Sequence, residues 1–488
     1  MKTQRKLKLN VASNNYLDTK YPVITSSAKA LNWSVTQGND WDITWRDGSV
    51  TLTMLSKMNK AQKINHFPGM FEISRKNCLA KNLNRFREVY PNDYDFYPQT
   101  WLLPQDLNKI KSMYKGTCPT LIVKPEASSQ GKGIHLVDKW EELNFIKSSI
   151  AQIYVNNPLL IDGLKFDLRI YVLITGCDPL RIYIHEEGLA RFATEAYKEP
   201  DPNNKTNRYM HLTNYAINKL NSNFIQNDDE SSSHSHKRSL SSILKDLELQ
   251  GRDSAGLWDD ICDLIIKTLI TAQPFLANTY KSAQSHDYLN GMCFEVLGFD
   301  VLIDNDLRPW LLEVNFTPSF TTDSQLDLRI KSEVVQDTLK TISLTEKKRQ
   351  KFEKIHSDYL KKRNNAAKTK QDQAELRFFA QEIRDSHEDM HRGGFIKIYP
   401  GADQFCYSKF LKHSQILWTG GLLELIYVPK LKRTESSTNN GLKSRENSLN
   451  QAANRRLSSA KKNSLRKVLN FDSLDTTPSK SKSRFTAY

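Results

Sequence analysis

The chain has 488 residues, of which 39% are hydrophobic, so it is long enough for two to four domains with real cores. Its six cysteines show no CxxC or framework spacing, which excludes a disulfide scaffold and favours a reducing, cytosolic compartment. No apolar run approaches the ~20 residues of a membrane-spanning helix, and no signal-peptide pattern opens the chain, so we expect a soluble globular protein.

The net charge of +15 is unevenly placed. Residues 346–370 contain ten Lys/Arg against three Asp/Glu, and residues 430–488 contain fourteen against four, which leaves the rest of the chain nearly neutral. A nearly neutral body with basic appendages indicates tethering to an acidic polymer, either a nucleic acid or a protein surface with acidic tails.

Turn signals among aromatic and β-branched residues predict a small β-containing unit over residues 31–75. Residues 116–216 alternate apolar strands with short loops, and the stretch "TLIVKPEASSQGKGIHLVD" predicts a strand, a loop and a second strand. In the loop "QGKGI", glycines flanking Lys132 let the backbone approach a phosphate. It is not a P-loop, because no Ser or Thr follows the lysine and a strand follows the loop. Lys124 on the first strand is either a partly buried cation that needs an anion or a surface lysine.

The stretch "LLIDGLKFDLRIYVLI" places charges of both signs on one strand face, because Lys165, Asp167 and Arg169 alternate with apolar residues. A solvated edge strand would explain the pattern, but the apolar flanks favour a polar cavity. Arg191 in "EEGLARFAT", and Thr213, Asn214 and Tyr215 in "HLTNYAINK", add groups suited to a carboxylate or a phosphate.

Residues 222–239 are polar and loop-like, whereas residues 254–281 have helical periodicity and lead to a strand pair at 293–303 and 309–316. Residues 345–390 carry few helix breakers and many charges, which predicts long helices. The Ser-, Asn- and Lys/Arg-rich stretch from about residue 431 predicts disorder.

The second strand of that pair, in "PWLLEVNFTPS", ends on two oxygen ligands. Side chains alternate along a strand, so Glu313 and Asn315 share one face while Leu312 and Val314 occupy the other. A turn signal follows at once, and α/β proteins commonly place ligand chemistry at strand ends. The alternative is a polar edge strand, because a hard-cation site needs more than two such ligands.

These motifs, in this order, resemble those of the tubulin tyrosine ligase-like enzymes over roughly residues 31–335. The segments that carry the resemblance are "DWDITWRDGSV", "KINHFPGM", "VKPEASSQGKGI", "LLIDGLKFDLRIYVLIT", "EEGLARFAT", "MHLTNYAINK", "FEVLGFDVLID" and "PWLLEVNFTPSF". The resemblance implies an α/β (α+β) fold with an ATP-grasp-like ligase core, a small N-terminal domain and a basic helical C-terminal extension. It also implies ATP and Mg²⁺ as cofactors and an acyl-phosphate intermediate that an amino acid's amine attacks.

The resemblance further implies roles for particular residues. Asp300, Glu313 and Asn315 would hold Mg²⁺, and Lys124 and Lys132 would face the ATP phosphates. The other implied nucleotide contacts are Gln130, Gly131, Gly133, Ile134, Gln152, Ile153, Tyr154, Val155, Lys165, Asp167, Thr213 and Asn214. The implied catalytic residues are Lys132, Arg169, Arg191 and Glu313. Arg191 would pair with the carboxylate of the incoming amino acid, with Tyr215, Lys237 and Thr317 as its neighbours.

The motif versions most resemble glutamate-adding members, although Phe316 stands where a small or imidazole side chain is expected. We therefore expect a tubulin polyglutamylase that uses free L-glutamate. Its basic extension, including "EKKRQKFEKIHSDYLKKR", would attract acidic tubulin tails over a Debye length of ~8 Å. A tubulin glycylase, a catalytically silent microtubule-binding protein and a nucleic-acid-binding ATPase are the alternatives, the last without any recognisable nucleic-acid motif. We expect no membrane partner, a monomer, and a location in the cytoplasm and microtubule cytoskeleton, with the cilium or basal body as further sites.

The expected organisation has eight parts. They are an N-terminal segment (1–30), an N-terminal α/β domain (31–115), a central ATP-grasp lobe (116–220), a polar loop (221–250), a C-terminal ATP-grasp lobe (251–342), a basic helical microtubule-binding extension (343–400), a short ordered continuation (401–430) and a disordered basic tail (431–488).

Overall fold

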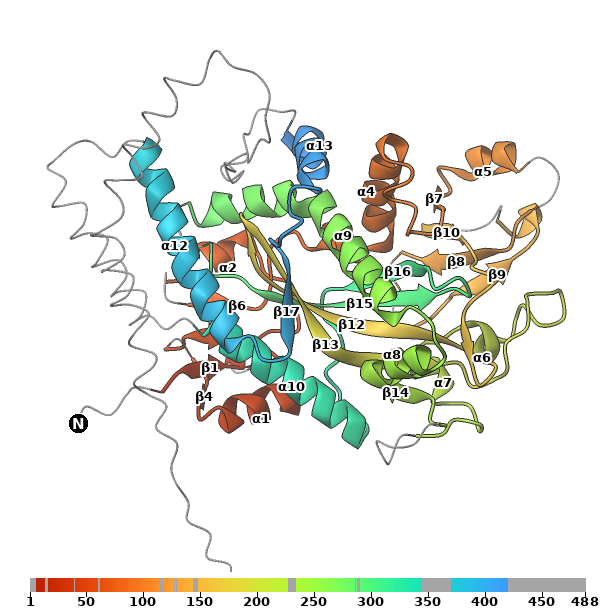
Figure 1. The fold of residues 1–488 in the computed structure, drawn as a ribbon, viewed down its shortest axis with the longest axis horizontal. Helices are drawn as coiled ribbons and strands as arrows, with labels where there is room; N and C mark the ends of the chain where they lie inside the picture. The colour runs from red at the N-terminus through yellow and green to blue at the C-terminus, as the bar shows by residue number, and fades with distance from the viewer. Residues whose placement is uncertain are drawn as a thin grey trace, which may run out of the picture. The chain divides into compact units, whose positions relative to one another are not determined.

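The computed structural model describes residues 6–13, 16–38, 40–59, 62–114, 118–126, 128, 130–143, 148–226, 234–285, 287, 290–343 and 370–419. All of them lie in the first of two compact units, Met1–Tyr427. Within these residues the fold mixes helices with several sheets, as the sequence predicted (Figure 1). The predicted disorder from about residue 431 falls outside the described residues.

A small parallel sheet lies near the N-terminus, with the strand order β4-β1-β5-β6. Its strands are β1 (Lys8–Asn10), β4 (Ser34–Thr36), β5 (Ile43–Thr44) and β6 (Lys63–Ile64), and α1 (Pro22–Ala30) connects the first two. The β-structure predicted within residues 31–75 is confirmed, since β4, β5 and β6 lie there. The domain boundary expected at residue 30 would separate β1 from β4, although these two strands pair with each other in one sheet. Nearby are β2 (Ala12–Ser13), β3 (Tyr16–Leu17), α2 (Leu52–Ser56), α3 (Phe71–Ser74) and α4 (Lys76–Val89).

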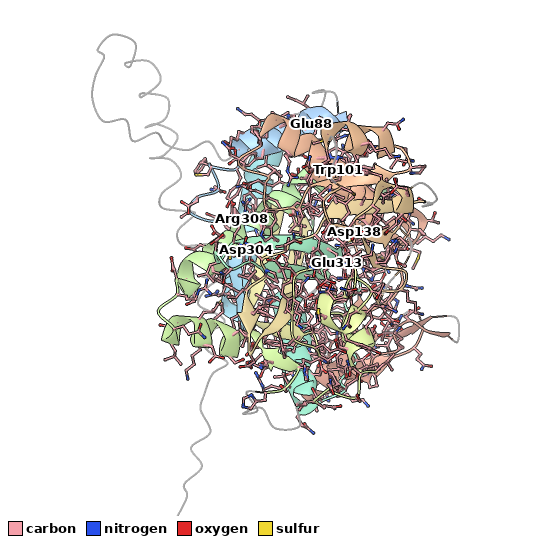
Figure 2. The ribbon with its side chains drawn as sticks, turned by 90° about the vertical axis from the view of Figure 1, so that its right-hand side faces the viewer. Glu88, Trp101, Asp138, Asp304, Arg308 and Glu313 are labelled. Atoms are coloured by element: carbon pink, nitrogen blue, oxygen red, sulfur yellow. The ribbon has the colours of Figure 1, made fainter. Side chains whose placement is uncertain are left out.

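A second, antiparallel sheet has the order β7-β10-β8-β9. Its elements are β7 (Thr100–Leu103), α5 (Leu107–Met113), β8 (Leu121–Pro125), β9 (His135–Val137), η1 (Trp140–Leu143) and β10 (Ser149–Ile153). Leu121 and Val123 face an apolar cluster with Trp101 and Ala151, so the alternating Lys124 and Gln152 face the other side. The predicted strand, loop and strand over "TLIVKPEASSQGKGIHLVD" are confirmed. Figure 2 labels Trp101 of this sheet and Asp138, which follows β9.

The central sheet is antiparallel, with the order β14-β13-β12-β15-β16. Its strands are β12 (Leu164–Cys177), β13 (Leu180–Phe192), β14 (Lys237–Ser239), β15 (Glu295–Ile303) and β16 (Pro309–Asn315), while β11 (Leu160–Ile161) pairs with β12. Helices α9 (Ser254–Ala283) and α10 (Gln325–Ile342) supply apolar residues to two separate core clusters. The shorter helices are α6 (Arg208–His211), α7 (Tyr215–Asn218) and α8 (Leu240–Leu249). The helix predicted at 254–281 and the strand pair after it are confirmed.

Alternation along β12 divides its side chains between two faces. Phe166, Leu168 and Ile170 belong to the cluster that includes α9, whereas Tyr171 and Leu173 belong to the cluster that includes α10. The charged residues at 165, 167 and 169 share the odd-numbered face with Tyr171 and Leu173. That face is therefore polar at one end and apolar at the other.

Helix α9 contains Pro274, which leaves one backbone carbonyl of the helix without its intrahelical hydrogen bond. A helix later in the chain donates a hydrogen bond to that carbonyl. Proline has no N–H, so the carbonyl of Ile270 loses its intrahelical hydrogen bond. Ser414 of α13 (Ser408–Thr419) donates its hydroxyl to that carbonyl at 2.7 Å. Trp418 Nε1 donates to the next carbonyl, that of Thr271, at 2.7 Å. Helix α13 is thus fitted into the core of the first unit.

Helix α12 (Lys370–His391) and strand β17 (Phe395–Tyr399) are also fitted into this unit. β17 pairs with β13. Arg181 of β13 is buried and binds Glu388 of α12 through Nε and Nη2, at 2.9 and 2.6 Å. The described part of the predicted basic extension is not basic, because residues 370–400 carry five Lys/Arg and six Asp/Glu. The basic residues concentrate in 344–369, which lie outside the described residues.

The turn between α12 and β17 requires glycine at Gly393, whose φ is +56°. A Cβ there would lie 2.1 Å from the carboxyl carbon of Asp337 on α10. That carboxylate accepts the N–H of Gly394 at 2.8 Å and lies 3.7 Å from His185 Nε2. Burial alone would raise the pKa of Asp337, but these groups and Lys340 lower it to about 2.

Candidate active site

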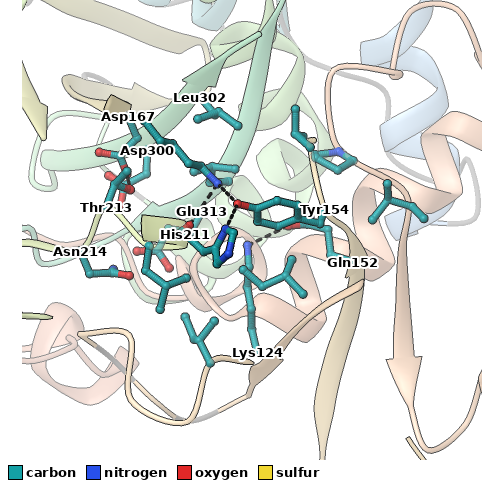
Figure 3. A pocket seen from close by; sticks show the side chains of 18 residues that line it. Lys124, Gln152, Tyr154, Asp167, His211, Thr213, Asn214, Asp300, Leu302 and Glu313 are labelled. Atoms are coloured by element: carbon teal, nitrogen blue, oxygen red, sulfur yellow. Dashed lines mark hydrogen bonds between the residues drawn. The ribbon is translucent and has the colours of Figure 1, made fainter. Parts of the chain in front are cut away.

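A pocket opens between the second sheet and the central sheet (Figure 3). Its lining comes from both sheets and from the segment around α6. The lining residues are Pro98, Ile122, Lys124, Ile134, Gln152, Ile153, Tyr154, Val155, Lys165, Asp167, His211, Leu212, Thr213, Asn214, Asp300, Leu302, Leu312 and Glu313. The polar cavity predicted from the β12 pattern is confirmed, and most of the predicted nucleotide contacts line it.

Charges of opposite sign alternate across three neighbouring strands at this pocket. Arg191 of β13 is opposite Asp167 of β12, and Arg169 of β12 is opposite Asp300 of β15. Arg191 donates to both oxygens of Asp167, at 2.7 and 2.6 Å, and also lies 2.8 Å from Asp300. Arg169 donates to both oxygens of Asp300, at 2.5 and 3.0 Å. We call these four residues the charge ladder.

The pKa values of the two carboxylates of the charge ladder are shifted in opposite directions. Burial would raise the pKa of Asp300, but Arg169 and Arg191 together hold it well below its usual range. Burial raises the pKa of Asp167, and Arg191 with the Thr213 hydroxyl, which donates to it at 2.9 Å, offsets only part of that rise. Asp300, held by two guanidinium groups, therefore remains anionic at neutral pH.

Two buried lysines bring positive charge to the pocket. Lys165 donates to the Tyr154 hydroxyl at 2.8 Å and to the carbonyl of His211 at 3.1 Å, and burial lowers its pKa to about 7. Lys124 donates to the side-chain oxygen of Gln152 at 2.7 Å, and burial lowers its pKa to about 8. Figure 3 shows Tyr154 facing His211 and Lys124 beside Gln152. An anionic ligand would stabilise the charged form of both lysines.

His211 was quoted within "HLTNYAINK" but given no role by the sequence. Its Nδ1 lies 3.1 Å from the Tyr154 hydroxyl, and burial and then Lys165 lower its pKa to about 4. It is therefore neutral at physiological pH and can accept that hydroxyl proton. Its place two residues before the predicted contact Thr213 is the only signal that the sequence offered.

The three expected metal ligands lie together, because the end of β16 with Glu313 and Asn315 pairs with the middle of β15, which carries Asp300. The Asn315 amide nitrogen lies 3.2 Å from Glu313 Oε1 and 3.4 Å from Asp300 Oδ2. Glu313 retains 25% side-chain exposure, and Lys76 Nζ lies 3.7 Å from it. In the part of the chain that the structure describes, no group of three or more His, Cys, Asp or Glu could hold a metal ion. Two carboxylates and an amide are all hard oxygen donors, so this set fits Mg²⁺ chemically.

The prediction that Leu312 faces away from Glu313 is wrong, since both residues line the pocket. The reason is a β-bulge: Asp300 is opposite Glu313, but the next residue, Val301, is opposite Leu311. The extra residue in β16 breaks the simple alternation, and its side chain turns towards the pocket. Val314 is buried in the core, as expected.

The glycine-rich loop contributes Ile134 to the pocket, while Gln130 and Lys132 are exposed and are not among its lining residues. Gly131 has φ +72°, and a Cβ there would lie 2.5 Å from Ile217 Cδ1 and 2.9 Å from Asn214 Oδ1. Only glycine fits this approach to α7.

Three of the four expected amino-acid contacts lie together, since Arg191 is opposite Lys237 in the β13–β14 pair and Lys237 contacts Tyr215, whereas Thr317 lies apart. Lys237 Nζ lies 3.7 Å from the centroid of the Tyr215 ring and 2.6 Å from Asp327 Oδ2. Arg191 belongs to the charge ladder, so a substrate carboxylate would have to share it with Asp167 and Asp300. Thr317 lines a different pocket, next to His66 and Phe316. Lys76 and Asp327 had no role in the sequence analysis, because only the folded chain brings them near Glu313 and Lys237.

A buried, mixed-charge pocket with two lysines and a carboxylate–amide set has the chemistry that a polyanion and a hard cation require. The sequence model of the tubulin-tyrosine ligase family matches residues 54–351 of this chain. The chain therefore belongs to that family. In the part of the chain that the structure describes, no helix has the length and apolar character needed to cross a membrane.

Curated relatives carry more specific names. A "Probable beta-tubulin polyglutamylase" of Tetrahymena thermophila is 48% identical over 80% of this chain and 34% of its own length. "Tubulin polyglutamylase TTLL13" of Mus musculus is 42% identical over 85% of this chain and 52% of its own. "Tubulin polyglutamylase TTLL7" of Homo sapiens is 35% identical over 84% of this chain and 50% of its own. The chain thus spans about a third to a half of the length of these relatives.

Proposed function

We propose that this chain is an ATP-dependent tubulin polyglutamylase, which joins free L-glutamate to glutamate side chains or branches on the acidic tails of tubulin. Family membership and the names of the relatives support this activity. The observation that carries it is the charge ladder beside Glu313 and Asn315, which places fixed cations, fixed anions and hard oxygen donors in one pocket.

When bound, ATP supplies a phosphoryl group that converts the acceptor carboxylate into an acyl phosphate, from which the amine of glutamate displaces phosphate. The chain's own part is binding and electrostatics. Lys124 and Lys165 neutralise charge on the nucleotide, and Asp300, Glu313 and Asn315 would hold Mg²⁺. Because these groups are fixed by buried hydrogen bonds, little reorganisation is needed when the reaction occurs.

The choice of amino acid rests on the cations around Tyr215 and Arg191. Glutamate carries two carboxylates and glycine carries one, so a site with two cations leaves one of them without a substrate partner when glycine binds. We propose that Lys237 and Arg191 are these two cations. Each is already paired with a carboxylate of the protein and would also bind a carboxylate of the substrate.

The remaining parts of the proposal concern partners and location. The basic residues within 344–369 would attract acidic tubulin tails, and the protein would act as a monomer on the microtubule cytoskeleton, including cilia or basal bodies. The division of the chain into eight parts remains a prediction.

The direct test is intact mass spectrometry of tubulin incubated with the chain, ATP, and equal concentrations of differently labelled glutamate and glycine. We expect mass increments of glutamate that require ATP. Preferential glycine incorporation would replace the polyglutamylase with a glycylase, and no increment, with microtubule cosedimentation retained, would indicate a silent binding protein. The Lys237→Met variant should no longer incorporate glutamate. Lys219→Met is the matched control and should still incorporate it, although the Lys219 amine of the parent lies 5.4 Å from the centroid of the same Tyr215 ring.

A further inference from the structure

The segment that follows β13 reaches from the central sheet to the second sheet. Its start and end are tied together, because Asn218 Oδ1 accepts the backbone N–H and the hydroxyl of Thr194 at 3.0 and 2.9 Å. Asn207, which caps α6, also donates to Glu195 at 2.6 Å. Residues 194–218 therefore form a braced platform on the central sheet.

Two basic side chains of this platform bind the opposite side of the pocket. Lys205 Nζ lies 2.6 Å from Asp138 Oδ1 and 2.8 Å from Glu142 Oε1, and these carboxylates follow β9 and lie in η1. Arg208 Nη2 donates to the carbonyl of Gly131 at 3.0 Å, in the glycine-rich loop. We call Lys205 and Arg208 the platform latch.

The glycine-rich loop has little regular structure of its own to fix it. Gly131 and Gly133 both have φ +72°, a left-handed backbone conformation that glycine adopts without steric cost. Such a loop loses much conformational entropy when it is fixed, so contacts from outside it must hold it. Arg208 binds it at Gly131, and Lys76 Nζ donates to the carbonyl of Ser128 at 3.0 Å on its other side.

We propose that Lys205 and Arg208 are positioning residues, which hold the second sheet and its glycine-rich loop closed over the nucleotide pocket although neither lines that pocket. The identity of the ligand as a nucleotide rests on the proposed function. The closure itself rests on contacts between the platform and the second sheet.

The expected effects are modest, because the pairs are partly exposed. The side chains of Lys205, Asp138 and Glu142 are 17%, 26% and 36% exposed, so salt screens them in part. Removing either latch residue should weaken ATP binding about two- to five-fold, and removing both about ten-fold. The difference in ATP affinity between the parent and the variants should become smaller as salt is added, because salt also screens the Lys205 ion pairs of the parent.

The first experiment uses the full chain without nucleotide and measures hydrogen exchange of peptides that cover residues 128–134. Lys205→Glu and Arg208→Ala should speed exchange there, whereas Lys198→Ala, which removes an exposed lysine from the same platform, should not. A reversed-charge variant, Lys205→Glu with Asp138→Lys and Glu142→Lys, should restore the slow exchange. Equal exchange in the parent, Lys205→Glu and Arg208→Ala proteins would overturn the proposal.

The second experiment measures the Kd of ATP by calorimetry for the same variants. We expect the losses given above and recovery in the reversed-charge variant. If the parent chain bound no ATP, the proposed function would fail, while the exchange experiment would still decide whether the latch holds the loop. If the parent bound ATP and all variants bound it equally, the latch proposal would fail and the proposed function would stand.

Discussion

Arg191 Nη2 lies 2.8 Å from Asp300 Oδ2, so the cation expected to receive the amino acid and a carboxylate expected to hold the metal form one ion pair. The same guanidinium binds both oxygens of Asp167. The proposed sites for the amino acid and for the nucleotide therefore share a charged group, so a change at one should alter the electrostatics of the other.

Loss of Arg191 should destabilise the fold as well as the activity. Arg191→Ala leaves the buried carboxylate of Asp167 without its main partner, which should cost about 3–5 kcal/mol of unfolding free energy in urea titrations. Adding Asp167→Asn should recover most of this stability but none of the ligase activity. If Arg191→Ala were as stable as the parent, the charge ladder would have no structural role.

Glu313→Gln should abolish ligation, because one proposed metal ligand loses its charge while its size is kept. We expect a fall of at least about 10²-fold in glutamate incorporation, with microtubule cosedimentation unchanged. Glu199→Gln, an exposed substitution of the same kind, serves as the matched control. Glutamylation by Glu313→Gln near the parent rate would show that this carboxylate is not part of the active site.

Nucleotide binding should take up protons at pH 8. In the free protein burial lowers the pKa of Lys165 to about 7 and of Lys124 to about 8, so at pH 8 the first is mostly neutral and the second about half charged. Phosphate charge raises both pKa values, and calorimetry in buffers of different ionisation enthalpy should detect the uptake. The uptake should fall at pH 6, where both lysines are already charged, and in Lys165→Met. Equal uptake at pH 6 and pH 8 would contradict this origin.

Microtubule attraction should depend on the basic stretch between α10 and α12. Changing Lys347, Lys348, Arg349, Lys361, Lys362 and Arg363 to Gln should reduce cosedimentation at low salt and leave ATP binding unchanged. The control neutralises six residues of the tail instead, namely Lys432, Arg433, Lys443, Arg445, Arg455 and Arg456. Truncation at residue 345 is a poor experiment, because it removes β17, α13 and the buried Glu388. Equal cosedimentation of both charge variants would place the binding surface elsewhere.

Two glycines with similar φ values should respond differently to alanine. Gly251 has φ +71° with open space around its Cβ position, so Gly251→Ala should cost only the backbone strain of about 1–2 kcal/mol. Gly393→Ala adds a clash with the Asp337 carboxylate and should cost about 1–3 kcal/mol more. Chemical denaturation of both variants measures the difference, and equal losses would mean that Asp337 moves aside freely.

The sequence predicted those features that depend on local pattern. The alternation along residues 165–169 identified the polar face of β12, and the Glu313–Asn315 spacing identified the end of β16. It missed features that depend on distant partners. The bulge at Leu312 follows from pairing with β15, and the pairing of Arg191 follows from its register with Asp167.

The C-terminal part of the fold was hardest to predict for the same reason. The charge count of residues 346–370 suggested an appendage, but the helix that follows buries Arg384, which donates to the carbonyls of Asn290 and Thr175. A charged helix that is anchored by a buried arginine has the composition of a solvated helix, so only its contacts distinguish the two.

The pairing of β17 with β13 also has a consequence for biosynthesis. Residues 182–185 meet their partner strand only when residues 395–399 have left the ribosome, about two hundred residues later. At typical translation rates that delay is about 10–40 s. Throughout it, part of the central sheet presents an unpaired edge, which is a template for aggregation. Chaperone demand during synthesis, rather than the stability of the finished protein, should therefore limit the yield of this protein in heterologous expression.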